Sequence, residues 1–293
     1  MNYREVDLNE EFLSKLYEPG SEEWEVRPPE RLYAVGEFPQ NRTARKVVAI
    51  VGSRASTPYG EQIAYDTAKL LAENDVIIVS GLAYGIDAAA HQGCLDGGGE
   101  TVAVLGTPID RIYPACNQGL ADRMLEHSGA ILSEYAPEDQ VFKENFTFRN
   151  RIVSGLADVL LVVEASRYSG TMATVSYALN QGRDVYAVPG DIDRVNSVGT
   201  NKIIMDGAKM FVGARAFLDE VVPDWRRRKA EKLAKKHGDE VSRIMVNIQD
   251  GYNTVKKLAK ILGCSTAVLT VKLGLLEIEG LVAIEGERIR LLK

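Results

Sequence analysis

The sequence predicts an α/β fold: a Rossmann-like parallel sheet with helices on both faces, followed by a small C-terminal winged-helix domain. From residue 47 onward, a short apolar run, a Gly-rich turn and a helical pattern follow one another repeatedly, as in a parallel sheet covered by helices. The apolar runs are continuous rather than alternating, which a sheet buried on both faces requires. At 293 residues and 45 % apolar composition, the chain is long enough for two domains.

Seven apolar runs rich in Val, Ile and Leu are the predicted strands. They are Val47–Val51, Val76–Val79, Thr101–Leu105, Ala130–Leu132, Val159–Val163, Asp184–Val188 and Lys209–Val212. Helices are expected between them. The best marked of these begins at Pro58, because proline is favoured in a first helical turn, and its apolar residues keep helical spacing to Glu73.

The C-terminal part abandons this rhythm. A charged run over residues 225–239 predicts a linker or an exposed helix. Three helices follow in the prediction, near Glu240–Gln249, Thr254–Leu262 and Thr266–Glu279, and then two short strands around Gly286. Three helices and a β-hairpin make a winged helix.

Charge is unevenly distributed along the chain. Residues 1–40 carry 4 basic and 10 acidic groups, residues 41–225 carry 16 and 23, and residues 226–293 carry 15 and 8. Nucleic-acid contact by the middle section therefore requires basic residues to gather locally on an acidic surface. The expected division is a short lead-in packed against the sheet (1–44), a Rossmann-like core (45–224), a charged linker (225–239) and a winged-helix domain (240–293).

The sequence shows no sign of export or membrane insertion. Its N-terminus lacks a signal-peptide pattern, and no apolar run approaches the roughly 20 residues that span a bilayer. Cys94, Cys116 and Cys264 are widely scattered without CxxC spacing, which argues against a disulfide framework or a zinc site. We expect reduced thiols, a cytoplasmic location and no membrane contact.

Three strand-to-helix turns are rich in small residues and hydroxyls. The candidate binding residues in them are Gly52, Ser53 and Arg54; Gly81, Tyr84, Gly85 and Asp87; and Ser169, Gly170 and Thr171. Such turns lie at the carboxyl ends of parallel strands, where helix N-termini present N–H groups to anions. One shared phosphate crevice is the functional interpretation. The alternative is that glycine only permits tight turns and close packing. If the crevice does bind phosphate, either a nucleotide or a polynucleotide could supply it.

A fourth candidate segment is Phe148-Arg149-Asn150-Arg151. Two guanidinium groups around an amide suit a phosphodiester backbone. The alternative is that these arginines lie on the surface and pair with carboxylates such as Glu144 or Asp158.

Motifs of common enzyme classes are missing from the sequence. The first turn is not GxGxxG, no GxxxxGK[ST] occurs, the serines lack a GxSxG elbow, and no histidine lies in HExxH. For His91, one helical turn after Asp87, we expect a helix-surface or capping role. The sequence thus predicts no catalytic set, no metal and no cofactor.

Several longer motifs together resemble the DNA-processing protein A (DprA/Smf) family. They are VAIVGSR (48–54), SGLAYGIDAAAH (80–91), FRNRIVSGLAD (148–158), VVEASRYSGTMATVSYALNQGRDVYAVPGDI (162–192) and SVGTNKIIMDGA (197–208). The resemblance implies a non-catalytic, single-stranded DNA-binding protein that protects incoming DNA and loads a RecA-type recombinase in natural transformation, and that forms a homodimer.

Carried over by motif, the resemblance also implies site residues. Gly52, Ser53, Arg54, Arg149, Asn150 and Arg151 would line the DNA pocket, and Gly81, Gly85 and Asp87 would shape its second loop. The chain departs from the family where Tyr84, Gln92 and Phe148 replace basic residues, which removes positive charge from the expected DNA face. Tyr84 and Phe148 could instead offer stacking faces to unpaired bases.

Two other functions remain open. One is a nucleotide-binding enzyme of phosphoribohydrolase type, although the PGGxGTxxE signature is missing and Val188-Pro189-Gly190-Asp191 is the nearest segment. The other is a winged-helix regulator that binds duplex DNA through Lys256, Lys257, Lys260 and Lys272. Against the second, its recognition helix, STAVLTVKLGLLEIEG, is apolar along most of its length.

Overall fold

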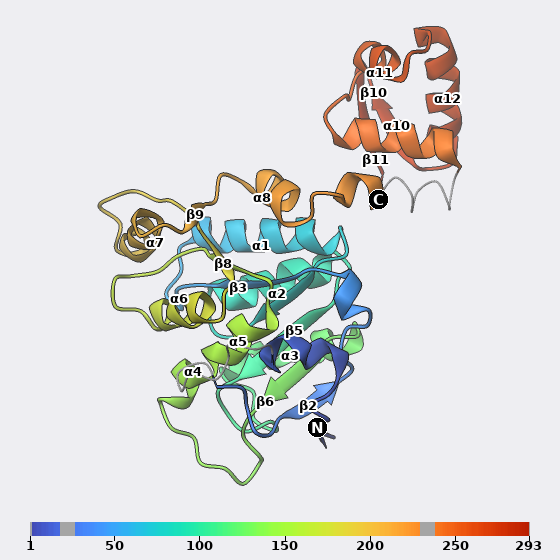
Figure 1. The fold of residues 1–293 in the computed structure, drawn as a ribbon. Coiled ribbons are helices and arrows are strands. Elements are labelled where there is room, and N and C mark those ends of the chain that lie inside the picture. The colour runs from blue at the N-terminus through green and yellow to red at the C-terminus, as the bar shows by residue number, and fades with distance from the viewer. Residues whose placement is uncertain (1, 18–26, 229–237, 293) are drawn as a thin grey trace. The chain divides into compact units, whose positions relative to one another are not determined.

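The computed structural model describes residues 2–17, 27–228 and 238–292 (Figure 1). The chain forms two compact units, Met1–Val222 and Pro223–Lys293. The first contains a sheet of nine strands, and the second contains a short helical stretch at residues 225–228, three longer helices and a two-stranded hairpin among its described residues.

The predicted apolar runs form parallel strands whose ends lie within two residues of expectation. They are β3 (Val47–Val51), β4 (Ile77–Ser80), β5 (Thr101–Leu105), β6 (Ala130–Ser133), β7 (Val159–Val162), β8 (Asp184–Ala187) and β9 (Lys209–Met210). The predicted α/β fold with a mostly parallel sheet is thereby confirmed.

The sheet is mixed, however, because the N-terminal segment adds an antiparallel pair. The strands β1 (Arg4–Glu5) and β2 (Tyr33–Gly36) pair with each other, and β2 also pairs antiparallel with β6. The 3₁₀ helix η1 (Glu11–Tyr17) buries Leu13 and Leu16 in the core of the sheet. The sequence pattern did not reveal β2, because this strand has only four residues and lies outside the strand-helix repeat.

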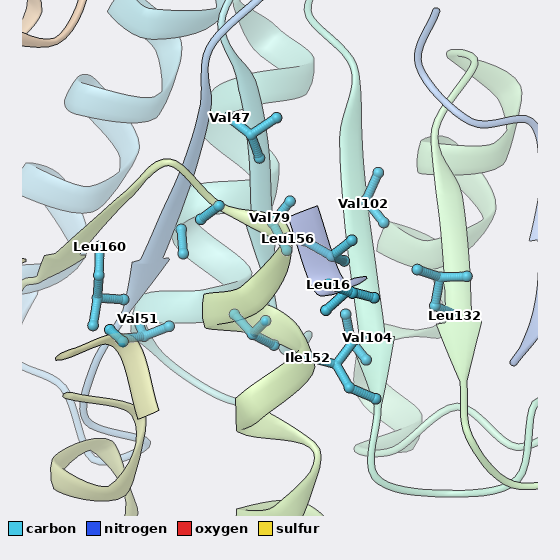
Figure 2. Packing of buried hydrophobic residues seen from close by; sticks show 14 of the residues in the cluster. Leu16, Val47, Val51, Val79, Val102, Val104, Leu132, Ile152, Leu156 and Leu160 are labelled. Carbon is cyan, nitrogen blue, oxygen red and sulfur yellow. The ribbon is translucent and has the colours of Figure 1, made fainter. Parts of the chain in front are cut away.

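Helices cover both faces of the sheet. The helices on one face are α5 (Asn150–Leu156), α6 (Gly170–Asn180) and α7 (Val195–Met205), with the short α4 (Asn145–Phe148) before them. On the other are α2 (Ile86–Asp96) and α3 (Gln118–Glu126), with α1 (Pro58–Ala72) along α2 and α8 (Ala214–Val221) against α1 (Figure 1). Figure 2 shows Val102 and Val104 of β5 on the side of Ile152 and Leu156 in α5. Ala103 and Leu105 of the same strand face the opposite layer, so β5 is buried on both sides.

The order of the strands reverses beside β3. The sheet order is β1-β2-β6-β5-β4-β3-β7-β8-β9. The chain therefore runs outward from β3 to β6, returns to the other side of β3 as β7, and continues outward to β9. Since α1 after β3 and α6 after β7 cover opposite faces, their first turns separate and leave a space at the carboxyl ends of the two strands. Ligands of open α/β sheets bind at such a switch point.

The second unit has its own small core. Its elements are α10 (Asp239–Gln249), α11 (Val255–Leu262), α12 (Thr266–Ile278), β10 (Val282–Glu285) and β11 (Arg288–Leu291), with Thr254 and Ser265 capping α11 and α12. Leu258, Leu269 and Leu273 are fully buried among these elements. The winged-helix assignment and the exact domain boundaries stay predictions. Within the predicted linker, residues 225–228 are helical and residues 229–237 lie outside the described residues.

No single described helix is both long and apolar enough to cross a bilayer. The pair α11 and α12 meets the criteria of length and composition only when taken together, and it is bent by 110°.

A candidate binding crevice at the carboxyl edge of the sheet

A cavity of about 390 Å³ opens at the switch point beside β3. We call it the crevice. Four segments that are distant in sequence line it: the loops after β3, β4 and β7, and the chain around α4 and the start of α5. Of the candidate residues proposed from the sequence, those that line the crevice are Gly52, Ser53, Arg54, Gly81, Asp87, Arg149, Asn150, Ser169, Gly170 and Thr171.

The loop after β3 brings Arg54 to the mouth of the crevice. Gly52 is required for the turn, because a methyl group at this position would lie 2.6 Å from Ile86 Cγ1 and 3.0 Å from the carbonyl oxygen of Glu164. Arg54 is exposed, and its guanidinium carbon lies 5.4 Å from the centre of the Phe146 ring. Within residues 2–17, 27–228 and 238–292, Arg54 makes no ion pair with a carboxylate. Its charge is therefore available to a ligand.

Asp87 holds the loop after β4 in shape. Its Oδ2 accepts hydrogen bonds from the backbone N–H of Gly81 at 3.1 Å and of Ala83 at 3.4 Å. Gly85 lies outside the crevice lining but permits the turn, since its φ is 73° and a methyl group there would lie 2.6 Å from the carbonyl oxygen of Ser53. Both residues shape this loop through contacts within the protein.

Arg149 forms the floor of the crevice. Its Nη1 donates to the carbonyl oxygen of Gly81 at 2.7 Å and to that of Val104, so it joins α5 to the ends of β4 and β5. Only 3 % of Arg149 is exposed. A side chain at residue 81 would collide with it, because an added methyl group would lie 2.7 Å from both Arg149 Cζ and Asp87 Oδ2. Arg149 thus lines the crevice, but its guanidinium already donates hydrogen bonds to carbonyl groups of the protein.

Burial changes the titration of the two charges at the floor. Desolvation raises the pKa of the Asp87 carboxyl group, an effect that the nearby Arg149 partly opposes. Desolvation also lowers the pKa of Arg149 to about 10, with Asp87 opposing the shift. The two groups stabilise each other's charge, and Arg149 remains a cation at neutral pH.

The N-terminus of α6 closes one side of the crevice. Ser169 is its N-cap residue, but its hydroxyl makes no capping bond and has no hydrogen-bond partner among the described residues. The first N–H groups of a helix carry partial positive charge and have no carbonyl partner within the helix. Ser169, Gly170 and Thr171 together therefore offer an anion site of the kind that binds phosphates.

The sequence analysis missed several lining residues, of which Lys143 and Phe146 matter most for ligand binding. Lys143 is exposed and, like Arg54, forms no ion pair in the described chain. Helical spacing could have identified them, because Lys143, Phe146, Thr147 and Asn150 follow an i, i+3, i+4, i+7 pattern and all four line the crevice. Phe146 adds an aromatic ring beside Arg54.

The same spacing explains why Arg151 is not in the crevice. The structure places its guanidinium inside the protein, where Nη2 donates to Glu134 at 2.6 Å and Cζ lies 3.8 Å from the Phe148 ring centre. Phe148 also lies outside the crevice lining, and Tyr84 borders a smaller adjoining hollow instead. The carboxylate partner of Arg151 is Glu134, neither of the two that the sequence analysis considered.

The expected helix-surface role of His91 is wrong. His91 is fully buried, and its Nδ1 lies 2.7 Å from Thr101 Oγ1. Because Thr101 Oγ1 donates to the carbonyl oxygen of Ile78, it accepts from His91, which fixes the proton on Nδ1. Burial, reinforced by the charge of Arg149, lowers the pKa of His91 to about 3. No group of three or more metal-ligating side chains occurs in the part of the chain described.

Comparison with known proteins places this chain in a family. The family model for DNA recombination-mediator protein A matches residues 12–222. The DNA processing protein DprA of Streptococcus pneumoniae is 43 % identical over 173 residues, which is 59 % of this chain and 61 % of that protein. Its crystal structure matches with a TM-score of 0.63 and 34 % identity over 75 % of both chains.

The match to a second solved structure covers nearly all of that protein's chain. DNA processing protein A of Helicobacter pylori, studied for its single-stranded DNA binding mode, matches with a TM-score of 0.65 and 28 % identity over 76 % of this chain and 97 % of that one. The match to curated relatives spans between 46 % and 73 % of their length. With its family model covering most of the first unit, the chain belongs to the DNA recombination-mediator protein A family.

Proposed function

We propose that the chain binds single-stranded DNA in the crevice, without catalysis, and presents it to a RecA-type recombinase. One observation carries the proposal: Arg54 and Lys143, neither paired with a carboxylate in the described chain, face a crevice that also receives the N-terminus of α6. Two free cations and a set of helix N–H groups in one cavity suit the spaced phosphates of a nucleic-acid backbone. Local concentration of charge at this edge accounts for DNA binding by an acidic core.

The aromatic ring in the crevice favours a single strand over a duplex. Phe146 presents a face beside Arg54, and unpaired bases stack on such faces, whereas bases in a duplex are already stacked on each other. The relative from Helicobacter pylori, studied for its single-stranded DNA binding mode, supports the same choice.

The contacts of Asp87 support a binding role over an enzymatic one. It is the carboxylate in the crevice lining, and its Oδ2 is occupied by two backbone N–H groups that shape the loop. A phosphoribohydrolase-type enzyme would instead need a carboxylate or a bound water free to act on a sugar. Incubation with AMP or ATP distinguishes the two roles. A binding protein should release neither base nor phosphate, whereas an enzyme would release one of them.

The partners and the location follow from the family and are proposals too. We propose a homodimer, for which the exposed apolar side chains of Val195, Met205 and Met210 around α7 and β9 offer a surface. A cytoplasmic location suits a protein that meets a recombinase. Light scattering of the full chain tests the dimer, and co-purification with a RecA-type recombinase in the presence of oligo-dT tests the partner.

The main test is binding of the full chain to labelled oligo-dT, to duplex DNA of the same length and to free nucleotides, each across a salt series. We expect oligo-dT to bind more tightly than duplex, with an affinity that falls as salt rises, because phosphate contacts release counterions. Equal affinity for duplex at all salt concentrations would favour a duplex-binding regulator. Tight binding of a nucleotide with hydrolysis would favour the enzyme.

A further inference from the structure

A small hollow adjoins the crevice on the side of β4 and β5. It measures about 30 Å³, and its walls include Tyr84, Tyr113 and Phe146, with Arg54 between the hollow and the crevice. Tyr84 and Tyr113 are 47 % and 49 % exposed. Because about half of each ring is exposed beside the Arg54 guanidinium, both rings offer a face to a ligand.

The rings are held in place by packing. The centres of the Tyr113 and Phe146 rings lie 5.3 Å apart at an angle of 59°, and the Arg54 guanidinium lies on the Phe146 ring. Gly106 permits this arrangement, because a methyl group there would lie 2.8 Å from Phe146 Cδ1. Phe146 is therefore shared between the hollow and the crevice.

A single amide connects the segments that carry the two tyrosines. Asn117 Nδ2 donates to the carbonyl oxygens of Leu82 at 2.9 Å and Ala83 at 3.2 Å. This pair of bonds ties the chain after Tyr113 to the loop that contains Tyr84. Asp87 holds the same loop through the backbone N–H groups of Gly81 and Ala83, so the backbone that carries Tyr84 is tied to the segment that follows Tyr113 before any ligand binds.

We propose that Tyr84 and Tyr113 form a stacking subsite for one unpaired nucleobase of a strand whose phosphate lies on Arg54. This inference rests on the proposed function of the crevice and adds where a base is bound. The hollow is too small to enclose a base, so the base lies across the exposed rings with one edge in solvent. Stacking on an aromatic face accepts every base, and a base within a duplex cannot reach it. The subsite therefore supplies single-strand preference without sequence preference.

The test separates base contacts from phosphate contacts. The full chain is titrated with oligo-dT and with an abasic oligonucleotide of the same length, which has the same phosphates but no bases. We expect wild type to prefer oligo-dT by roughly tenfold or more, the range of one or two stacked bases. In the double variant Tyr84→Ala/Tyr113→Ala, this preference should shrink severalfold while affinity for the abasic strand stays unchanged.

Controls distinguish stacking from other causes. The double variant Tyr84→Phe/Tyr113→Phe keeps both rings and should retain the wild-type preference. Tyr3→Ala removes a tyrosine of matched exposure (45 %) that packs edge-on against Tyr33, beside the edge strand β1 and outside the lining of both the hollow and the crevice, and should change neither affinity. Strands that contain 5-iododeoxyuridine should photo-crosslink to the peptides that hold Tyr84 or Tyr113.

The outcomes also separate this inference from the proposed function. If oligo-dT binds and Arg54→Ala weakens it, but Tyr84→Ala/Tyr113→Ala keeps the full preference for oligo-dT over the abasic strand, the subsite is refuted and the crevice stands. If neither strand binds wild type, the proposed function itself fails. Loss of affinity for both strands in the alanine variant would assign the tyrosines to the shape of the crevice and overturn the stacking role.

Discussion

Two regions that contribute arginine to the crevice use it in opposite ways. In the loop after β3, Arg54 is exposed and forms no ion pair in the described chain. In the segment around the start of α5, Arg149 and Arg151 are only 3 % and 2 % exposed, and they are bonded to carbonyl groups and to Glu134. An arginine close to a candidate site can thus either contact a ligand or hold segments of the protein together, and its own hydrogen bonds decide which.

The difference arises from what each backbone segment leaves unsatisfied. The loop after β3 leaves the sheet toward solvent, so the Arg54 side chain meets no acceptor. The start of α5 crosses the ends of β4 and β5, where the carbonyl groups of Gly81 and Val104 lie just beyond the last paired residues of these two strands and need donors. A guanidinium with five N–H groups can satisfy several such acceptors at once. Arg149, which we call the frame arginine because it holds these segments together, therefore lies where the ends of β4 and β5 meet.

The largest effect should come from removing the frame arginine. Arg149→Met leaves two buried carbonyl groups without a donor and Asp87 without its neighbouring cation, so we expect the free energy of unfolding to fall by about 3–5 kcal/mol. Arg54→Met should change it by less than about 0.5 kcal/mol, because the residue is exposed. Urea unfolding of both variants measures the difference. Wild-type stability of Arg149→Met would erase the distinction between the two regions.

The buried histidine beside the frame should make stability depend on pH. His91 is neutral when folded, and its pKa of about 3 lies below the unfolded value of 6.5. Its contribution is therefore complete above pH 6.5 and is lost as pH falls toward 3, by about 3 kcal/mol between pH 7 and pH 4. His91→Gln cannot take up this proton, so its stability should decline less steeply over that range. Parallel pH profiles of the two proteins in urea would show that the histidine is not responsible.

The free arginine should matter for DNA and not for stability. Arg54→Ala removes a charge-assisted phosphate contact, and we expect a loss of about 1.5–3 kcal/mol in binding to oligo-dT, tenfold or more in affinity. Lys46→Ala is the matched control, because it removes an exposed charge at the amino end of the same strand β3, away from the crevice. Fluorescence anisotropy measures both. Equal losses in the two variants would indicate a general charge effect rather than a site.

Much of the fold could be predicted because its signals are local. Each parallel strand is a continuous apolar run, and a strand buried on both faces, such as Thr101–Leu105, leaves no other pattern. The Gly-rich turns also identified three walls of the crevice, and at Gly52 and Gly81 the neighbouring atoms lie too close for any side chain. The family resemblance agreed with both.

The roles of individual charged residues could not be predicted, because they depend on partners that are distant in the chain. Arg149 is fixed by carbonyl groups 45 and 68 residues away, and His91 by the hydroxyl of Thr101 on a neighbouring strand. Residue type and spacing do not show that a guanidinium points inward. Lys143 was overlooked for the opposite reason: it lies before α4 in a run without a recognised motif, although its spacing to Asn150 is helical.

The smallest effect should come from replacing Lys143. This variant tests whether the chain around α4 and the start of α5, which carries Arg149 and Arg151, also contributes a free charge to the crevice. Lys143→Ala removes one cation from the crevice, and its flexible side chain makes a weaker contact than a forked guanidinium, so we expect only a severalfold loss of affinity for oligo-dT. If the ammonium group binds a phosphate, the slope of log affinity against log salt should decrease by about 0.7, the value for one contact to a single strand. Stability in urea should not change, since the side chain is exposed. An unchanged salt slope would mean that this segment supplies the frame alone, and that Arg54 and the N-terminus of α6 bind the strand without it.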